Sequence, residues 1–277
     1  MDFQALLSDG ATLAPEVLLT PNGPKRDLAF QFSGSRITKV GTFQDFPQAV
    51  SLPGRAIVPG FVDAHTHVGQ IFGKALIGGE PAQIWRRIWH PMERDMDEKQ
   101  SYLSAKWAFW EALRGGFTKV VNYGLNSLEK NAGVHRAAFE TGIRFVSATG
   151  LDEFSGEIGT GHGKKTWPEI EEVIRAHIED CAGQDVIVPS VCCSSFMGNT
   201  TETLAKLSAL CAKKGILLQI HCNEHFPEVH ESIVRYGLRP TELLHKSDVL
   251  GPHVLLHHTT LVSESEIELI IDTDTAT

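Results

Sequence analysis

The sequence feature that most constrains the fold is an alternation of short apolar runs with longer helical patterns, which starts near residue 57. The runs are rich in Val, Ile and Leu and show little polar alternation, as expected for parallel strands that helices cover. They lie at residues 60–65, 118–123, 143–148, 185–191, 216–221 and 253–258. Repeated βα units predict an α/β fold whose parallel sheet is either doubly wound or closed into a barrel.

Helical patterns separate these runs, at residues 98–114, 128–140, 167–181, 203–214, 228–245 and 264–271. The first of them carries apolar side chains at helical spacing and stops at Gly115 and Gly116, as helices commonly do. We expect an interruption of the fifth at Pro240, because proline lacks the amide proton that a helix interior needs.

A glycine-rich phosphate loop would favour the doubly wound alternative. Residues 159–165 come nearest to one, but Ile158 stands where a P-loop has its first glycine. Lys164 stands where a dinucleotide-binding motif has its third. This segment is then either a mobile loop near a site or a plain surface turn, and no phosphate signature supports a nucleotide-binding sheet.

Residues 1–56 differ from the rest of the chain. Short apolar segments at 16–19, 28–32 and 37–40 alternate with turn-forming Pro, Gly, Asn and Ser. We therefore predict two parts, a small β-rich portion over residues 1–56 and the βα portion over residues 57–277.

Charge and cysteine content exclude several classes of protein. The 277 residues hold 25 Lys and Arg against 34 Asp and Glu, a net charge of −9 without a basic run. Such a chain is a poor partner for nucleic acid or for an anionic membrane surface. No apolar stretch is long enough to span a bilayer, and the first residues do not resemble a signal peptide. Five irregularly spaced cysteines fit a reducing cytoplasm.

The first chemically informative segment ends the first βα strand with His65 and His67. Side chains two residues apart share one face of a strand, so both imidazoles can reach one metal ion. Residues 59–63 read Pro-Gly-Phe-Val-Asp, and this context makes the His-x-His pair a strong signal. Asp63 lies one step deeper on the same face, where we expect it to orient a ligand.

The second segment places His221 at the end of the fifth strand and Glu224 in the loop that follows. Residues 221–225 also read His-x-x-Glu-His, a zinc-protease motif that needs a helix to bring its histidines together. We reject the protease interpretation, because an apolar strand precedes the motif and Pro227 follows it. His225 is then a loop residue.

Three further features are less decisive. His257 and His258 end the sixth strand, and strand alternation predicts that only one of them faces the inside of a barrel. His177 and Glu179 match the His-x-Glu of nucleobase deaminases without the accompanying cysteine pair, and in a helical pattern they are most simply solvated. Trp85 lies near the loop after the first strand, where it can line a pocket.

These segments resemble those of the amidohydrolase superfamily, in particular the branch of aminohydrolases and chlorohydrolases that act on purines, triazines and related rings. The resemblance runs over nearly the whole chain. It is most specific at residues 59–67, at Gln70 with the downstream stretch 85–91, at 116–118, at 221–224 and at 255–267. It implies a (β/α)8 TIM-type barrel with a small β-sandwich made from both chain ends.

The resemblance also implies a metal site. One divalent ion, zinc or alternatively iron, would be held by His65, His67 and His221, together with an Asp after the eighth strand. The metal would activate a water molecule at neutral pH. The implied reaction is hydrolysis of a C–N bond other than a peptide bond, most simply deamination of a heterocyclic amine.

The catalytic residues implied by the resemblance are Glu224 and His257, the latter rather than His258. Glu224 would protonate a ring nitrogen and then pass the proton to the leaving amine, while His257 positions the attacking water. Gln70 and Trp85 are expected to contact the substrate, which would be a purine, pterin, pyrimidine or triazine. We expect no nucleic-acid or membrane partner, and a homo-oligomer is left open.

The chain departs from the family pattern in three places. Residues 189–193 hold no histidine after the fourth strand, and Thr260 stands where a second histidine is usual. Too few residues follow His253 for two more βα units, so we expect an incomplete barrel of about six units. Asp272 and Asp274 follow the last helix and do not replace the missing metal-binding Asp. The alternative interpretation is therefore a truncated or inactive fragment that acts, if at all, as a binding chain or pseudoenzyme.

Overall fold

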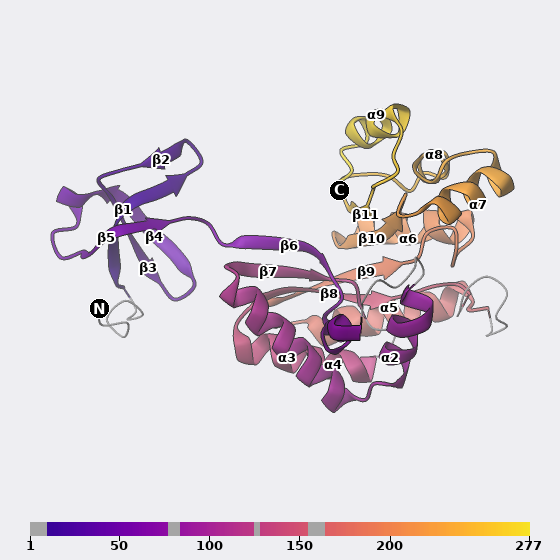
Figure 1. Cartoon of the computed structure of the whole chain (residues 1–277), viewed down its shortest axis with the longest axis horizontal. Coiled ribbons are helices and arrows are strands. Elements are labelled where there is room, and N and C mark those ends of the chain that lie inside the picture. Colours follow the sequence, from indigo (N-terminus) through magenta and orange to yellow (C-terminus); the bar gives the residue numbers. More distant parts are fainter. Residues whose placement is uncertain (1–9, 77–83, 125–127, 155–163) are drawn as a thin grey trace. The chain divides into compact units, whose positions relative to one another are not determined.

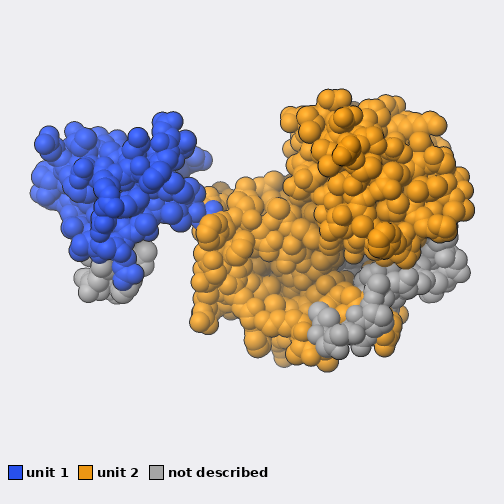
Figure 2. All heavy atoms as spheres, turned by 45° about the horizontal axis from the view of Figure 1, so that its top comes forward, with its two compact units in different colours: residues 1–60 blue, residues 61–277 orange. Residues whose placement is uncertain are grey.

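A computed structural model describes residues 10–76, 84–124, 128–154 and 164–277 of the chain (Figure 1). The chain divides into two compact units, residues 1–60 and residues 61–277, which Figure 2 colours separately. Most of the glycine-rich segment 159–165 and part of the stretch after Gln70 lie outside the described residues.

The first unit is a five-stranded sheet built from β1 (Thr12–Thr20), β2 (Gly23–Lys25), β3 (Leu28–Ser33), β4 (Arg36–Thr42) and β5 (Val50–Ile57). Antiparallel pairs join β1 to β2 and β3, and β3 to β4. Gly34 makes the turn between β3 and β4 with a positive φ of 54°, a conformation that glycine adopts without strain. The expected apolar segments lie within β1, β3 and β4, so the β-rich character of this region is confirmed.

The sequence interpretation missed β5, which pairs with β1 in parallel. Pro53 and Gly54 lie inside this strand, and both residues argue against a strand interior. The sheet accommodates them with a shift of register between Pro15 and Val17 of the partner strand. Gly54 has a φ of 70° and donates its backbone N–H to Glu16 Oε2 at 3.0 Å.

The second unit contains a six-stranded sheet in which every neighbouring pair is parallel. Its strands lie within a residue or two of the predicted runs. They are β6 (Phe61–Thr66), β7 (Phe117–Asn122), β8 (Arg144–Gly150), β9 (Ile187–Cys193), β10 (Leu217–Cys222) and β11 (Val254–His258).

The strand order separates the two predicted architectures. Each strand pairs with the one before it in the sequence, in the order β11-β10-β9-β8-β7-β6. A doubly wound sheet would reverse direction at a switch point, whereas a barrel does not. β6 and β11 are the outermost strands of this sheet. His65 of β6 nevertheless stacks on His257 of β11 with 3.8 Å between ring centroids, which shows that the sheet curls. The fold is that of a TIM-type barrel with six βα units in the described part of the chain.

Helices follow the strands and cover the outer face of the sheet (Figure 1). They include α3 (Glu98–Arg114), α4 (Leu128–Thr141), α5 (Trp167–Cys181), α6 (Thr201–Lys214) and α9 (Glu264–Asp272). Their ends follow local capping chemistry. Asp97 caps α3 by accepting the Gln100 backbone N–H at 2.7 Å, and Gly215 ends α6 in the left-handed conformation.

The predicted interruption at Pro240 is confirmed. One helix, α7 (Phe226–Tyr236), ends at Gly237, and a second, α8 (Pro240–Lys246), starts with the proline in its first turn. Shorter helical segments η2 (Val68–Leu76), η3 (Trp85–Trp89) and α2 (His90–Asp95) connect β6 to α3. Glu93 of α2 lies beside the residue that follows β6, with its Oε1 3.9 Å from His67 Nδ1.

The residues after α9 take part in the sheet. Leu256 donates its backbone N–H to the Ala276 carbonyl oxygen at 2.9 Å, and Ala276 donates to the Val254 carbonyl oxygen at 3.1 Å. This single parallel bridge lies beside β11. The polar tail is thus an ordered addition to the edge of the sheet.

All five cysteines are free and buried. None of the helices in the described ranges has the length and apolar character needed to cross a membrane.

Candidate metal centre

Five imidazoles gather at the carboxyl ends of β6, β10 and β11. The ring of His65 lies 5.1 Å from that of His67, 5.0 Å from that of His221 and 4.9 Å from that of His258, measured between centroids. His67 and His221 stack at 5.5 Å. The sequence therefore identified three histidines, His65, His67 and His221, that the fold brings together.

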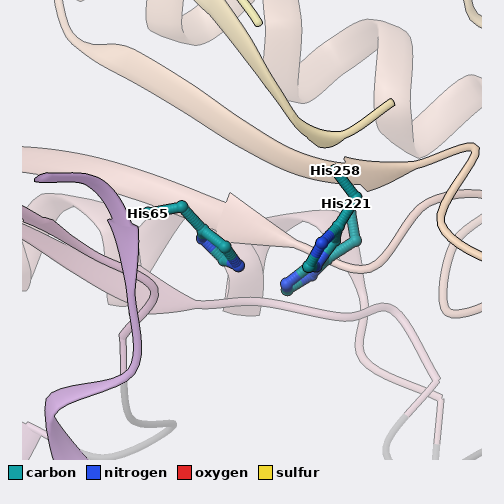
Figure 3. A group of neighbouring side chains, drawn as sticks. All are labelled: His65, His221 and His258. Atoms are coloured by element: carbon teal, nitrogen blue, oxygen red, sulfur yellow. The ribbon is translucent and has the colours of Figure 1, made fainter. Parts of the chain in front are cut away.

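The possible ligand atoms of His65, His221 and His258 all lie within 4.8 Å of one another. Figure 3 shows the ring of His65 pointing across a gap toward those of His221 and His258. His67 lies beside this group, with its Nδ1 3.9 Å from Glu93 Oε1. Donors from three separate strands thus converge on one point.

Strand alternation does not separate His257 from His258 as expected. His258 has a φ of 72° and Thr259 a φ of 46°, so the regular strand ends at this point and the backbone turns. His258 stacks on His221 at 5.1 Å, while His257 stacks on His65 at 3.8 Å. Both imidazoles reach the same cluster, because the alternation rule holds only inside a strand.

Burial favours the neutral form of His65, His67, His221 and His257. It lowers the pKa of His65 to about 4, that of His67 to about 3 and that of His257 to about 2, and neighbouring imidazoles add to each effect. The same causes hold the pKa of His221 well below its usual range. A neutral imidazole is the form that binds metals.

The donor set fits a divalent metal ion. His65 Nδ1 is buried and has no hydrogen-bond partner among the described residues, and an orphaned buried nitrogen of this kind is costly unless something binds it. Imidazole nitrogens suit zinc, copper, iron and nickel. The cluster is therefore chemically suited to the cofactor that the sequence suggested.

The predicted acid, Glu224, lies next to the cluster. Its Oε1 is 3.8 Å from Nε2 of His258. Two hydrogen bonds hold its backbone, since its N–H donates to Glu228 Oε2 at 2.9 Å and its carbonyl oxygen accepts from Thr260 Oγ1 at 2.9 Å. The preceding Asn223 has a φ of 53°, so a rigid, left-handed turn places Glu224.

A chain of hydrogen bonds fixes the protonation of His257, which is buried. Ser190 Oγ donates to the Ser147 carbonyl oxygen at 3.0 Å and therefore accepts from Gln219 Nε2, at 2.9 Å. The amide nitrogen of Gln219 also donates to the Asn122 carbonyl oxygen at 3.2 Å, so its Oε1 faces His257 Nε2 at 3.0 Å. Only a protonated Nε2 can donate there, and Nδ1 of His257 is left as an acceptor.

Other predicted site residues have mixed placements. Asp63 accepts a hydrogen bond from the backbone N–H of His65 at 3.2 Å, so the contact fixes the main chain of His65. Gln70 donates its Nε2 to Glu93 Oε1 at 3.2 Å and lies near His67 through that carboxylate. The backbone of Trp85 starts η3, but its side chain lies outside the described residues.

Two residues of the site were missed in the sequence. Glu93 of α2 is largely buried, and burial raises its pKa to about 7. Tyr123 follows β7 and packs on His221 with 4.1 Å between ring centroids. The position of Tyr123 directly after a strand was an available signal, since barrel sites form at strand ends. No local pattern marked Glu93.

Two motifs were not assigned to the site from the sequence, the His-x-x-Glu-His segment and the His177–Glu179 pair. His221 lies in β10 while His225 directly precedes α7, so no helix carries the His-x-x-Glu-His segment as a protease site would. His177 is fully buried, so the expectation of a solvated side chain is wrong. Sequence spacing put it on a helix, but one face of α5 packs against the sheet.

Comparison with solved structures supports the fold. An adenosine deaminase from Xanthomonas campestris with bound zinc superposes with a TM-score of 0.82 at 18% identity, covering 96% of this chain and 61% of that one. A zinc complex of atrazine chlorohydrolase from Arthrobacter aurescens gives a TM-score of 0.82 at 17% identity, covering 96% and 64% of the two chains.

Curated proteins with similar sequences include deaminases. A 5'-deoxyadenosine deaminase of Methanobrevibacter smithii is 28% identical over 85% of this chain and 53% of its own length. A 5-methylthioadenosine/S-adenosylhomocysteine deaminase of Thermodesulfovibrio yellowstonii is 24% identical over 86% of this chain and 54% of its own. The chain thus spans about half the length of these relatives.

The family itself follows from a match over most of the chain. The sequence profile of the amidohydrolase family matches residues 56–275, which include all of the clustered histidines and Glu224. The same residues form the curled parallel sheet and the imidazole cluster described above. This chain therefore belongs to the amidohydrolase family.

Proposed function

We propose that the protein is a metal-dependent hydrolase of C–N bonds that deaminates a purine-type heterocyclic amine, with an adenosine derivative as the preferred substrate class. The observation that carries the proposal is the convergence of His65, His67 and His221 in one cluster, which the carboxylate of Glu224 meets at His258. The deaminase activities of the curated relatives support the choice of substrate class.

We propose zinc, with iron as the alternative, in the imidazole cluster. A divalent ion held there supplies Lewis-acid activation of water, whose pKa it lowers toward about 7. His65, His67 and His221 would hold it. Nδ1 of His67 faces Glu93, an arrangement in which a carboxylate orients the ring and leaves Nε2 for the metal.

Glu224 moves the proton in this proposal. Its carboxylate accepts a proton as the water oxygen adds to the ring carbon, and it donates that proton to the adjacent ring nitrogen. The carbon–nitrogen bond to the exocyclic amine then breaks, and the protons end on ammonia and on the product ring. A fixed backbone on both sides of Glu224 suits this role, because proton transfer requires a defined distance.

His257 acts through its unprotonated nitrogen. Gln219 keeps the proton on Nε2, so the Nδ1 lone pair is available to accept a hydrogen bond from the attacking water. Since the pKa of His257 is about 2, the ring stays neutral during turnover. We propose that His257 orients the water while Glu224 carries the proton.

The test of the proposed function uses the full chain with its metal content measured first. We expect stoichiometric zinc or iron and ammonia release from 5'-substituted adenosines, with slower or no release from triazines and pterins. A chain that is loaded with metal but inactive on the whole panel would favour the binding-chain or pseudoenzyme alternative. A chain that binds no metal would contradict the proposal.

Separate substitutions of His67 and His258 test the ligand set. We expect His67→Asn to lower zinc affinity by more than about 100-fold and His258→Asn by less than about tenfold. The reason is that Nε2 of His258 faces Glu224, whereas Nδ1 of His67 faces Glu93. Competition with a chromophoric chelator measures both affinities, and the reverse order would assign His258 to the metal in place of His67.

A further inference from the structure

A second group of metal-binding side chains lies away from the imidazole cluster. His135 of α4 and His177 and Cys181 of α5 are all buried, and their possible ligand atoms lie within 4.8 Å of one another. His177 and Cys181 are four residues apart on one helix, so they share a face. Nitrogen and sulfur donors at this spacing are those that zinc prefers.

The group lies between the helices and the outer face of the sheet. Ser147 of β8 contacts both histidines, with its Oγ 2.7 Å from His135 Nε2 and its carbonyl oxygen 2.9 Å from His177 Nε2. Phe145, two residues earlier on the same strand face, packs on Phe109 of α3 with 5.1 Å between ring centroids. Ser147 therefore faces the helical layer, whereas His65 and its neighbours face the interior.

A carboxylate orients one of the imidazoles. Asp180 Oδ2 lies 2.9 Å from His135 Nδ1, which places the ring proton on Nδ1 and leaves Nε2 as an electron-pair donor. Metal-binding histidines commonly donate their other ring N–H to a carboxylate, a backbone carbonyl or water. Asp180 has a side-chain exposure of 45%, so solvent reaches the edge of an otherwise closed group.

Hydrogen bonds alone do not satisfy this group. His177 is fully buried, and its Nδ1 has no hydrogen-bond partner among the described residues. Cys181 Sγ lies 3.9 Å from His177 Nε2, too far for a strong hydrogen bond. A buried nitrogen without a hydrogen bond is expensive in a packed interior, and a metal ion bound to it would remove that cost.

We propose that His135, His177 and Cys181 form a second, structural metal site that takes a zinc-like divalent ion, with Asp180 as the partner that orients His135. Binding breaks the thiol S–H bond, forms a sulfur–metal bond and releases the proton to solvent on the side of Asp180. The ion would tie α4 to α5 over β8. It would lie outside the barrel, apart from the cluster proposed for catalysis.

Cobalt(II) distinguishes the two sites, because only the second one contains a thiolate. Metal-free protein is titrated with Co²⁺ and followed by absorption. We expect a thiolate-to-cobalt charge-transfer band in the near ultraviolet, together with a second equivalent of cobalt that gives no such band. Cys181→Ser should abolish the band, lower cobalt affinity at this site by more than about tenfold and leave the band-free equivalent in place.

The matched control is Cys211→Ser, which replaces another fully buried helical cysteine that belongs to neither group of ligands. It should keep the band. If Cys181→Ser does not fold, His135→Gln serves as the second variant, because it retains the thiol. It should lower the cobalt affinity measured from the charge-transfer band by the factor expected for Cys181→Ser. Saturation of the wild-type protein without a band, or a band that survives Cys181→Ser, would overturn the proposal.

Discussion

Replacing Glu224 with glutamine is expected to lower the rate of deamination by about 10²–10⁴-fold, the usual contribution of a positioned acid–base group. Glutamine has the same shape and keeps the backbone hydrogen bonds to Glu228 and Thr260. It cannot accept a proton from water and donate it to a ring nitrogen. The bound metal should remain, because the proposed ligands are imidazoles.

Steady-state ammonia release and metal analysis of the same preparation measure the effect. The control is Glu268→Gln on the exposed side of α9, which makes the same chemical change away from the site and should leave the rate unaltered. A Glu224→Gln protein with near-native turnover would remove Glu224 from the mechanism. Loss of metal along with activity would instead make it part of the metal site.

Substitution of Glu266 by alanine is expected to have the largest effect on stability, about 3–5 kcal/mol. This fully buried carboxylate of α9 accepts hydrogen bonds from Asn223 Nδ2 at 3.0 Å, from the Thr241 backbone N–H at 3.1 Å and from Arg239 Nε at 2.7 Å. Alanine would leave Arg239 without its charged partner and the Thr241 backbone N–H without an acceptor, and Asn223 Nδ2 would keep only the Leu261 carbonyl oxygen at 3.4 Å. It would also release the turn that places Glu224.

Urea unfolding measures this change, and Glu268→Ala on the same helix should shift stability by less than about 0.5 kcal/mol. Burial raises the pKa of Glu266, but Arg239 and the Ser263 backbone N–H outweigh it and hold the pKa below the ordinary value of 4.5. A carboxyl group whose pKa is lower in the folded state stabilises the fold above about pH 4.5. This contribution of Glu266 should therefore fade as the pH falls below that value. A loss below 1 kcal/mol at neutral pH would contradict the interpretation.

The elements that sequence predicted best carry their own end signals. Residues 98–114 and 167–181 were predicted without error, because an acidic or hydroxyl cap precedes each helix and apolar residues recur at helical spacing. The strand that the sequence interpretation missed was β5. Pro53 and Gly54 argue against a strand there, and the strand forms only because β1 offers a partner. Local propensity cannot reveal a pairing between distant segments.

The residues of the candidate site also divide into those that the sequence predicted and those that it did not. His65, His67 and His221 end strands, so their meeting follows from parallel topology alone. His258 joins them through a left-handed backbone conformation. The residue type does not predict this conformation. Glu93 reaches His67 from α2, after a connection with no regular period. Contacts that depend on loop paths are fixed by tertiary packing, which no short pattern encodes.

The curl of the sheet links metal binding to folding. β6 and β11 are the outermost strands and pair with different neighbours, yet imidazoles from β6, β10 and β11 meet between them. An ion bound there would be a removable cross-link between segments far apart in the chain. Each tenfold rise in free metal above its dissociation constant would then add about 1.4 kcal/mol to the unfolding free energy. The melting temperature of this protein would in effect report the metal concentration around it.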